Sequence, residues 1–295
     1  MWCALQAWAR SLVFAIACGV LVSLATGLVE NQPEISIIGF RHYGYPLVWQ
    51  VTKTLQPADF VPTNLAIDTV FWIVISVFGL IFLERIVFPK LGISIKYKTL
   101  LLPLALLIPL GLFMDVIHEF SHAVWGTAVG GTLAYMKIAY FEIFPQPAMT
   151  PQFVLGYVEV HGLSTDSQYG LFLLGGSLTT NIVSWVLAVT QLRLKLGQKT
   201  RLVLKILGLF GLLDLPLYVL LPQIGMQHWL FLGGDIPEPL IGARKIGIPD
   251  ILFYIIVALA TLDLIFLYFK PIRQKVREKI VRVSLGVMIR KSLPS

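Results

Sequence analysis

Six long runs of apolar residues follow one another along the chain, separated by shorter and more polar segments. An apolar run of about 20 residues is long enough for a helix to cross the hydrocarbon core of a bilayer. The pattern therefore predicts an all-α membrane protein that forms one integral membrane domain over residues 1–295. The predicted transmembrane helices cover residues 11–29, 65–88, 99–128, 169–192, 202–222 and 250–269.

The first apolar run has two interpretations. The small residues around positions 23–27 would suit a cleavable signal peptide. The length of the run favours a retained membrane anchor, and we count it as the first span.

Two of the intervening segments predict structure outside the membrane. Residues 30–64 mix polar residues with several prolines and glycines, which indicates an extramembrane loop with room for short strands. Residues 131–167 are rich in strand formers, and residues 156–161 alternate apolar and polar side chains. We expect a short membrane-associated β element, a hairpin or small sheet, after the third span.

Composition agrees with the membrane class, since the chain is 57% hydrophobic, only 13% charged and has a mean hydropathy of +0.80. The formal net charge of +7 does not indicate nucleic-acid binding, because the basic residues cluster beside the apolar runs. The two cysteines, Cys3 and Cys18, lie near the N-terminus and imply neither a disulfide framework nor a cysteine zinc site.

Charge asymmetry predicts the orientation. The segments after spans two, four and six are basic, whereas those after spans one, three and five are balanced or slightly acidic. By the positive-inside rule, we expect a multi-pass protein of the cell membrane with both termini in the cytoplasm. The end of the third span then lies in the outer half of the membrane.

That end of the third span carries the pattern H-E-x-x-H at residues 118–122. On a helix, His118 and His122 project from one face and can bind one metal ion, which predicts a zinc site. Zinc lowers the pKa of a bound water from about 16 to about 7, and Glu119 is placed to take its proton as the general base. Ionisable groups at the edge of a membrane span are costly and indicate function.

A catalytic zinc takes three protein ligands, so a third ligand must come from elsewhere in the chain. Asp214 is a lone carboxylate inside the apolar fifth span, where ligation would compensate its burial. Asp235 is the alternative, because its loop can turn back toward the site. Helix rise places Asp214 about 10 Å shallower than His118, which favours Asp235, whereas the cost of desolvation favours Asp214.

Three other residues fit the site less well. Asp115 lies one turn before His118, and three ligands on one helix would span too far for one ion, so we expect a supporting or pore-facing role. His161 is expected to be a solvated strand histidine rather than a ligand. Asp263 lies far from the motif in sequence and is left unassigned.

Over roughly residues 99–222, the chain resembles the site-2 protease family of intramembrane zinc metalloproteases in a compact prokaryotic form. The motif helix, a glycine turn into a β element, a Gly-rich span with an asparagine and a span with an aspartate follow in the family's order. The resemblance implies His118, His122 and an aspartate as zinc ligands and Glu119 as the general base. It also implies that Asn181 orients the substrate.

The chain departs from the family pattern at two positions. In the fourth span, Ser177 stands where the family has a proline after the glycine, and Asn181 falls one residue later than the family's asparagine. In the fifth span, Leu215 rather than glycine follows Asp214. The resemblance also implies a site nearer the cytoplasm, whereas the charge pattern places it toward the outside.

The function expected from the sequence is hydrolysis of peptide bonds in membrane-spanning proteins by a water that zinc activates. The alternative is an inactive membrane scaffold or binding protein with the same fold. A transporter fits less well, because the chain has no paired half-repeats. Neither the substrate nor the oligomeric state follows from the sequence.

Overall fold

The computed structural model describes residues 2–31, 39–53, 56–93, 95–228, 234 and 236–269, and it is mostly helical. The helices are α1 (Trp2–Ala25), α2 (Pro62–Phe82), α3 (Phe88–Leu91), α4 (Tyr97–Ala128), α5 (Asp166–Arg193), α6 (Gln198–Leu220), α7 (Glu238–Lys245) and a final helix over Asp250–Phe269. Short helical turns cover Thr26–Leu28, Leu83–Val87 and Leu221–Ile224.

Within the described residues, six helical segments are long and apolar enough to cross a membrane, as many membrane-length apolar helices as the sequence predicts. They cover Trp8–Leu28, Pro62–Leu91, Thr99–Ala128, Asp166–Arg193, Gln198–Ile224 and Asp250–Phe269. The segment expected to begin at residue 169 starts at Asp166, because Thr165 and Gln168 form a reciprocal capping box there. The observed ends of the segments therefore differ from the predicted ends by a few residues, and the order of the segments is as predicted.

The strands form two antiparallel sheets, so the fold is not purely α. The hairpin expected after the third span is present and is long, with β4 (Thr132–Phe144) paired to β5 (Ala148–His161). The predicted loop over residues 30–64 contains a second sheet of β1 (Phe40–Tyr43), β2 (Gln50–Lys53) and β3 (Gln56–Phe60). Phe60 of β3 packs edge-on against Phe153 of β5, with 5.1 Å between the ring centroids, and this contact joins the sheets.

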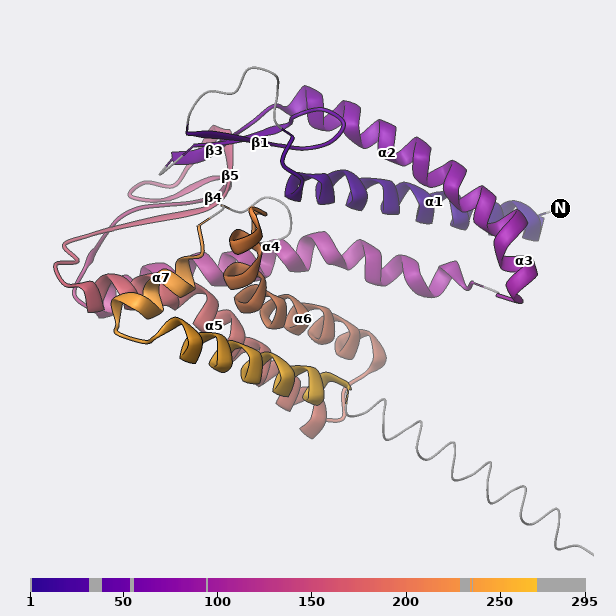
Figure 1. Ribbon diagram of the computed structural model, residues 1–295. Coiled ribbons are helices and arrows are strands. Elements are labelled where there is room, and N and C mark those ends of the chain that lie inside the picture. Colours follow the sequence, from indigo (N-terminus) through magenta and orange to yellow (C-terminus); the bar gives the residue numbers. More distant parts are fainter. Residues whose placement is uncertain are drawn as a thin grey trace, which may run out of the picture.

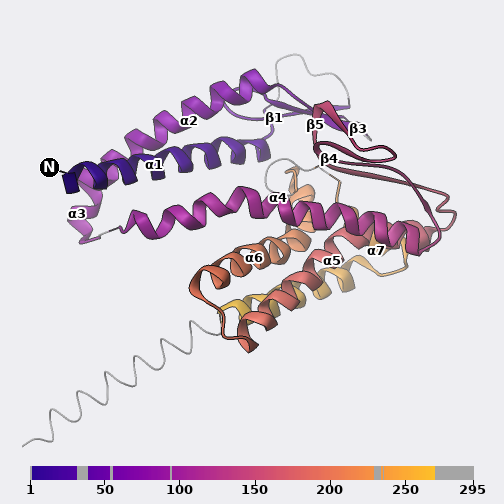
Figure 2. The ribbon, with the colours of Figure 1, turned by 180° about the vertical axis from the view of Figure 1, so that it is seen from behind.

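Helix α4 lies in the middle of the molecule, with α1 and α2 on one side and α5, α6 and the final helix on the other (Figures 1 and 2). The two sheets lie at one end, where β4 and β5 also contact α4. One core cluster joins Met114 of α4, Leu155 of β5 and Phe210 of α6. This packing brings the second half of α4 against β5, α5 and α6.

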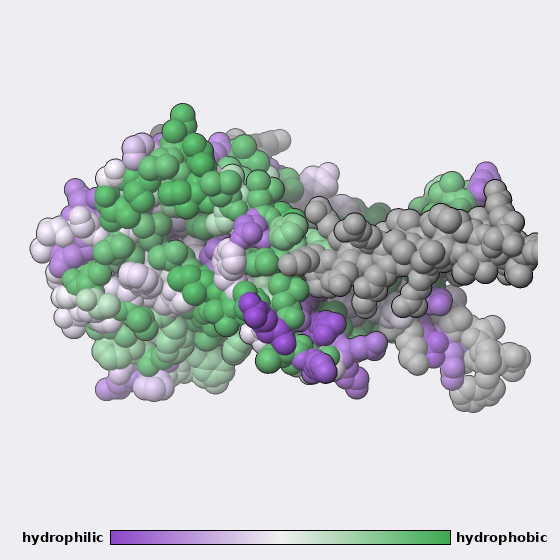
Figure 3. Space-filling model, turned by 90° about the horizontal axis from the view of Figure 1, so that it is seen from below, coloured by the Kyte–Doolittle hydropathy of each residue, from purple (hydrophilic) through white to green (hydrophobic). Residues whose placement is uncertain are grey.

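Much of the surface is apolar. Figure 3 shows apolar residues over a large part of one face of the molecule. Helix α2 buries few of its residues and exposes Val70, Phe71 and Phe78, and the final helix exposes Ile251 and Leu259. Two features predicted from the sequence, Asp235 and the basic tail from Lys270, lie outside the described residues.

Candidate metal centre

The H-E-x-x-H motif lies in the second half of α4, and both histidines are buried. The Nε2 atoms of His118 and His122 lie 3.0 Å apart. The four-residue spacing on one helix face produces this arrangement, as the sequence predicts.

The other nitrogen of each ring is already engaged. His122 Nδ1 lies 2.7 Å from the backbone oxygen of Phe172, and a carbonyl only accepts, so Nδ1 carries the proton. His118 Nδ1 lies 3.0 Å from Asp214 Oδ2 and donates to that carboxylate. A ring that is neutral and has its proton on Nδ1 has a bare lone pair on Nε2. Two lone pairs that face each other at this distance repel unless a cation or a proton lies between them.

The backbone of Gly176 in α5 packs closely against both nitrogens. A Cβ on Gly176 would lie 2.4 Å from His122 Nε2 and 2.5 Å from His118 Nε2. A side chain at this position would therefore collide with both Nε2 atoms, so only glycine allows α5 to approach the histidine pair this closely.

Asp214 of α6 lies beside His118, although on the ring nitrogen that faces away from His122. Thr180 of α5 donates to the same Asp214 oxygen, Oδ2, at 2.5 Å. The other oxygen, Oδ1, is buried and has no hydrogen-bond partner within the described residues. The structure therefore joins Asp214 to the motif through a hydrogen bond to His118.

Glu119 lies against strand β5 at Gly156. A Cβ on Gly156 would come within 2.2 Å of Glu119 Oε1, so only glycine leaves room for this carboxylate. Glu119 also interacts electrostatically with His118. The proposed base therefore lies between the histidine pair and the backbone of β5.

Three residues that sequence reasoning did not single out adjoin the histidines. Glu238 Oε2, at the start of α7, lies 3.6 Å from His122 Nε2. The Tyr218 hydroxyl donates to Glu238 Oε2 at 3.0 Å, and the Tyr218 ring stacks on both His118 and His228. Burial raises the pKa of the Glu238 carboxyl, an effect that nearby His118 opposes. Burial also lowers the pKa of His228 well below its ordinary value.

The charges around His118 are mostly acidic. Asp115, Glu119, Asp214 and Glu238 all interact with it electrostatically. Within the described part of the chain, no lysine or arginine forms an ion pair with any of these four carboxylates. A bound divalent cation would supply the missing positive charge.

Among the described residues, no three His, Cys, Asp or Glu side chains lie in positions that could bind one metal ion without rearrangement. Asp115 is buried, and its Oδ2 has no described hydrogen-bond partner. Asn181 is buried without a described partner for Nδ2, and its neighbour Thr180 makes the contact with Asp214 instead. His161 is exposed and pairs with Glu159 at 2.7 Å, which confirms a solvated strand histidine. Asp263 lies half-buried on the final helix.

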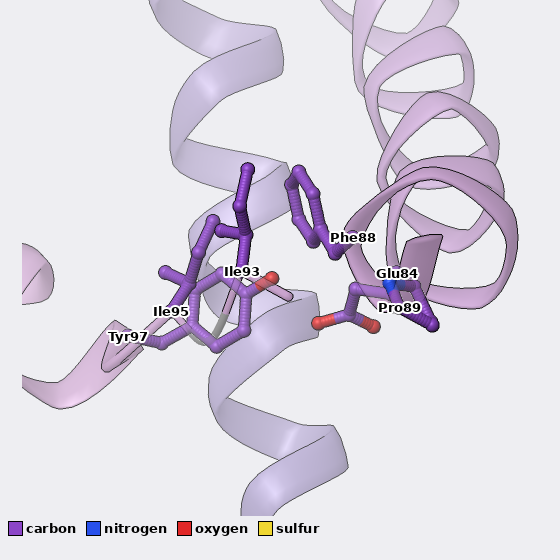
Figure 4. A pocket seen from close by; sticks show the side chains of 6 residues that line it. All are labelled: Glu84, Phe88, Pro89, Ile93, Ile95 and Tyr97. Atoms are coloured by element: carbon purple, nitrogen blue, oxygen red, sulfur yellow. The ribbon is translucent and has the colours of Figure 1, made fainter. Parts of the chain in front are cut away.

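A hollow of about 290 Å³ lies near the junction of α3 and α4 (Figure 4). Its lining residues are Glu84, Phe88, Pro89, Ile93, Ile95 and Tyr97. It offers one carboxylate and one phenol but no histidine or cysteine, so it is a poorer candidate for chemistry than the motif.

Comparison with models of known families, with curated proteins and with solved structures finds no match for this chain.

Proposed function

We propose that this protein is an intramembrane zinc metalloprotease that hydrolyses peptide bonds of membrane-spanning substrates. The observation that carries the proposal is the pair of Nε2 atoms 3.0 Å apart, which point toward each other while the Nδ1 of each ring is held by a partner of its own. Histidine pairs fixed in this way by carbonyl and carboxylate partners are typical of metal ligands.

The donor set fits zinc. Two imidazole nitrogens on zinc, in tetrahedral geometry, lie about 3.3 Å apart. The separation in the structure is 3.0 Å, and no side chain of residue 176 covers the two nitrogens. When bound, zinc would polarise a water molecule and the scissile carbonyl.

The chain's own residues would supply the remaining steps. Glu119 would accept a proton from the attacking water and pass it to the leaving amine. Asp214, supported by Thr180, would keep the His118 ring in the orientation and tautomer that leave Nε2 free. Strand β5 touches Glu119 at Gly156, and we propose that the reacting peptide binds beside it.

The apolar surface supports a membrane setting. The exposed side chains of α2 and of the final helix are those expected to contact lipid tails rather than water. We propose a multi-pass protein of the cell membrane, with both termini cytoplasmic and the substrate a single membrane-spanning helix that enters from the bilayer and unwinds at the site.

The test is cleavage of a model membrane substrate in parallel with the zinc content of the purified protein. Glu119→Gln should retain zinc and lose nearly all cleavage, while Glu159→Gln, the same change on the exposed part of β5, should keep both. Zinc binding without cleavage in the wild-type protein would favour the alternative, an inactive scaffold. Absence of zinc from the wild-type protein would refute the proposal.

A further inference from the structure

We infer that Glu238, rather than Asp214, is the third protein ligand of the metal, and that Asp214 acts by positioning His118. The inference rests on the function proposed above, because it completes the same metal centre.

The distances around His122 place Glu238 on the metal-facing side. His122 Nε2 lies 3.0 Å from His118 Nε2 and 3.6 Å from Glu238 Oε2. Neighbouring ligands of one tetrahedral zinc are separated by about 3.3 Å, so both distances are near what a shared ion needs. A small rotation of the Glu238 side chain would bring its oxygen into bonding range.

Asp214 lies on the opposite side of the His118 ring. Its Oδ2 is held on Nδ1, and Nδ1 and Nε2 point away from each other across an imidazole. An ion bound to Nε2 would lie roughly 6 Å or more from that oxygen. To reach the ion, Asp214 would have to leave both His118 and Thr180. A carboxylate that accepts the second N–H of a ligating histidine is a common outer partner of metal sites.

A hydrogen bond from Tyr218 orients the Glu238 carboxylate. The Tyr218 hydroxyl donates to Oε2, and Tyr218 itself is buried beside His118. A hydrogen bond of this kind orients a ligating carboxylate and limits its rotation.

Helix α7, which begins at Glu238, is itself held tightly. Leu240 and Ala243 are fully buried in a cluster that includes residues of α6 and the final helix. On another side, a Cβ on Gly242 would lie 2.6 Å from the backbone oxygen of Gly170 in α5, so the two backbones are in close contact. The position of Glu238 next to His122 is therefore set by packing and not only by its own rotamer.

A thiolate scan with Co²⁺ tests the assignment without relying on activity. Co²⁺ replaces zinc at such sites, and a cysteine ligand adds a strong thiolate-to-cobalt absorption band in the near ultraviolet. The variants Glu238→Cys and Asp214→Cys are made in a chain whose native cysteines are both replaced by serine. We expect the band in Glu238→Cys and none in Asp214→Cys.

Zinc affinity provides a second measurement, which does not require the cysteine variants to fold. Asp214→Asn should lower zinc affinity by roughly 10- to 100-fold, as loss of an outer partner does, and Glu238→Gln should lower it further. Tyr218→Phe, which keeps the stacked ring and removes the hydroxyl, should produce an intermediate loss. Glu159→Gln is the matched control and should bind zinc as the wild-type protein does.

A band in Asp214→Cys alone, or a larger loss of affinity in Asp214→Asn than in Glu238→Gln, would overturn the inference. So would cobalt bound to Glu238→Cys with no thiolate band. In each of these cases the wild-type protein still binds the metal, and the proposed function stands. A wild-type protein that binds no metal would refute the proposed function and this inference together.

Discussion

Gly176 of α5 lies directly in front of His118, so that a Cβ on this glycine would come within 2.5 Å of Nε2 and fill the space between the two histidines. The lack of a side chain at residue 176 thus lets α5 pack against both proposed ligands without displacing them. Neither residue is near the other in sequence, and the contact exists because α5 packs against α4.

The first prediction follows from this contact. Gly176→Ala should reduce bound zinc from about one ion per chain to near zero, because the new methyl group would collide with both Nε2 atoms and displace the nitrogens that bind the ion. The helix itself should tolerate alanine, which has the higher helix propensity. Elemental analysis of purified protein measures the outcome. Gly197→Ala is the control, because nothing lies within 4 Å of a Cβ there. A Gly176→Ala variant with full zinc content would show that the metal, if bound, lies elsewhere.

The second prediction separates metal ligands from other histidines. His118→Ala should lose most of the zinc, because a catalytic site with one ligand fewer binds far more weakly. His161→Ala should retain the zinc, since His161 is exposed and, among the described residues, forms its ion pair with Glu159. Equal metal content in the two variants would mean that the motif is misassigned.

The third prediction concerns Glu119 and strand β5. Gly156→Ala should displace the Glu119 carboxylate, because the added methyl group would overlap it. A misplacement of about 1 Å can cost on the order of 100-fold in rate, so we expect kcat to fall by about that factor. Zinc content should be unchanged, because the atoms nearest the new methyl group belong to Glu119 and not to a histidine.

The outcome for Gly156→Ala is measured by comparing kcat, KM and zinc content with those of Gly79→Ala. A Cβ on Gly79 would meet nothing within 4 Å, so that variant should resemble the wild-type protein. Unchanged kcat in Gly156→Ala would place Glu119 outside the reaction.

The helices could be predicted from the sequence because membrane-length apolar runs are a strong local signal. Their exact ends could not, since the start of α5 depends on the capping box of Thr165 and Gln168. The second sheet was missed as a sheet because β1 to β3 are short and lie among prolines and glycines.

Half of the candidate site was visible in the sequence and half was not. His118, Glu119 and His122 form a local motif on one helix, so spacing alone brings them together. Glu238 follows His122 by 116 residues (238 − 122) and lies between two prolines, which indicates a loop. Only the packing of α7 on α5 and α6 brings it to the histidines. The local signal was weak: an acidic residue between two prolines at the start of a short helix.

The last prediction tests the orientation in the membrane. Gln146 lies in the turn between β4 and β5, Lys195 lies between α5 and α6, and both are exposed. Helix α5 has 28 residues and so is about 42 Å long, enough to place its two ends on opposite sides of a bilayer. Single cysteines replace Gln146 and Lys195 in a chain without Cys3 and Cys18, and the cells are treated with a thiol reagent that does not cross membranes. Because the basic segments share the cytoplasmic side, the cysteine at position 146 should react in intact cells. The cysteine at position 195 should react only after lysis. Labelling of position 195 from outside would reverse the topology and place the metal centre nearer the cytoplasm, as the resemblance to site-2 proteases implies.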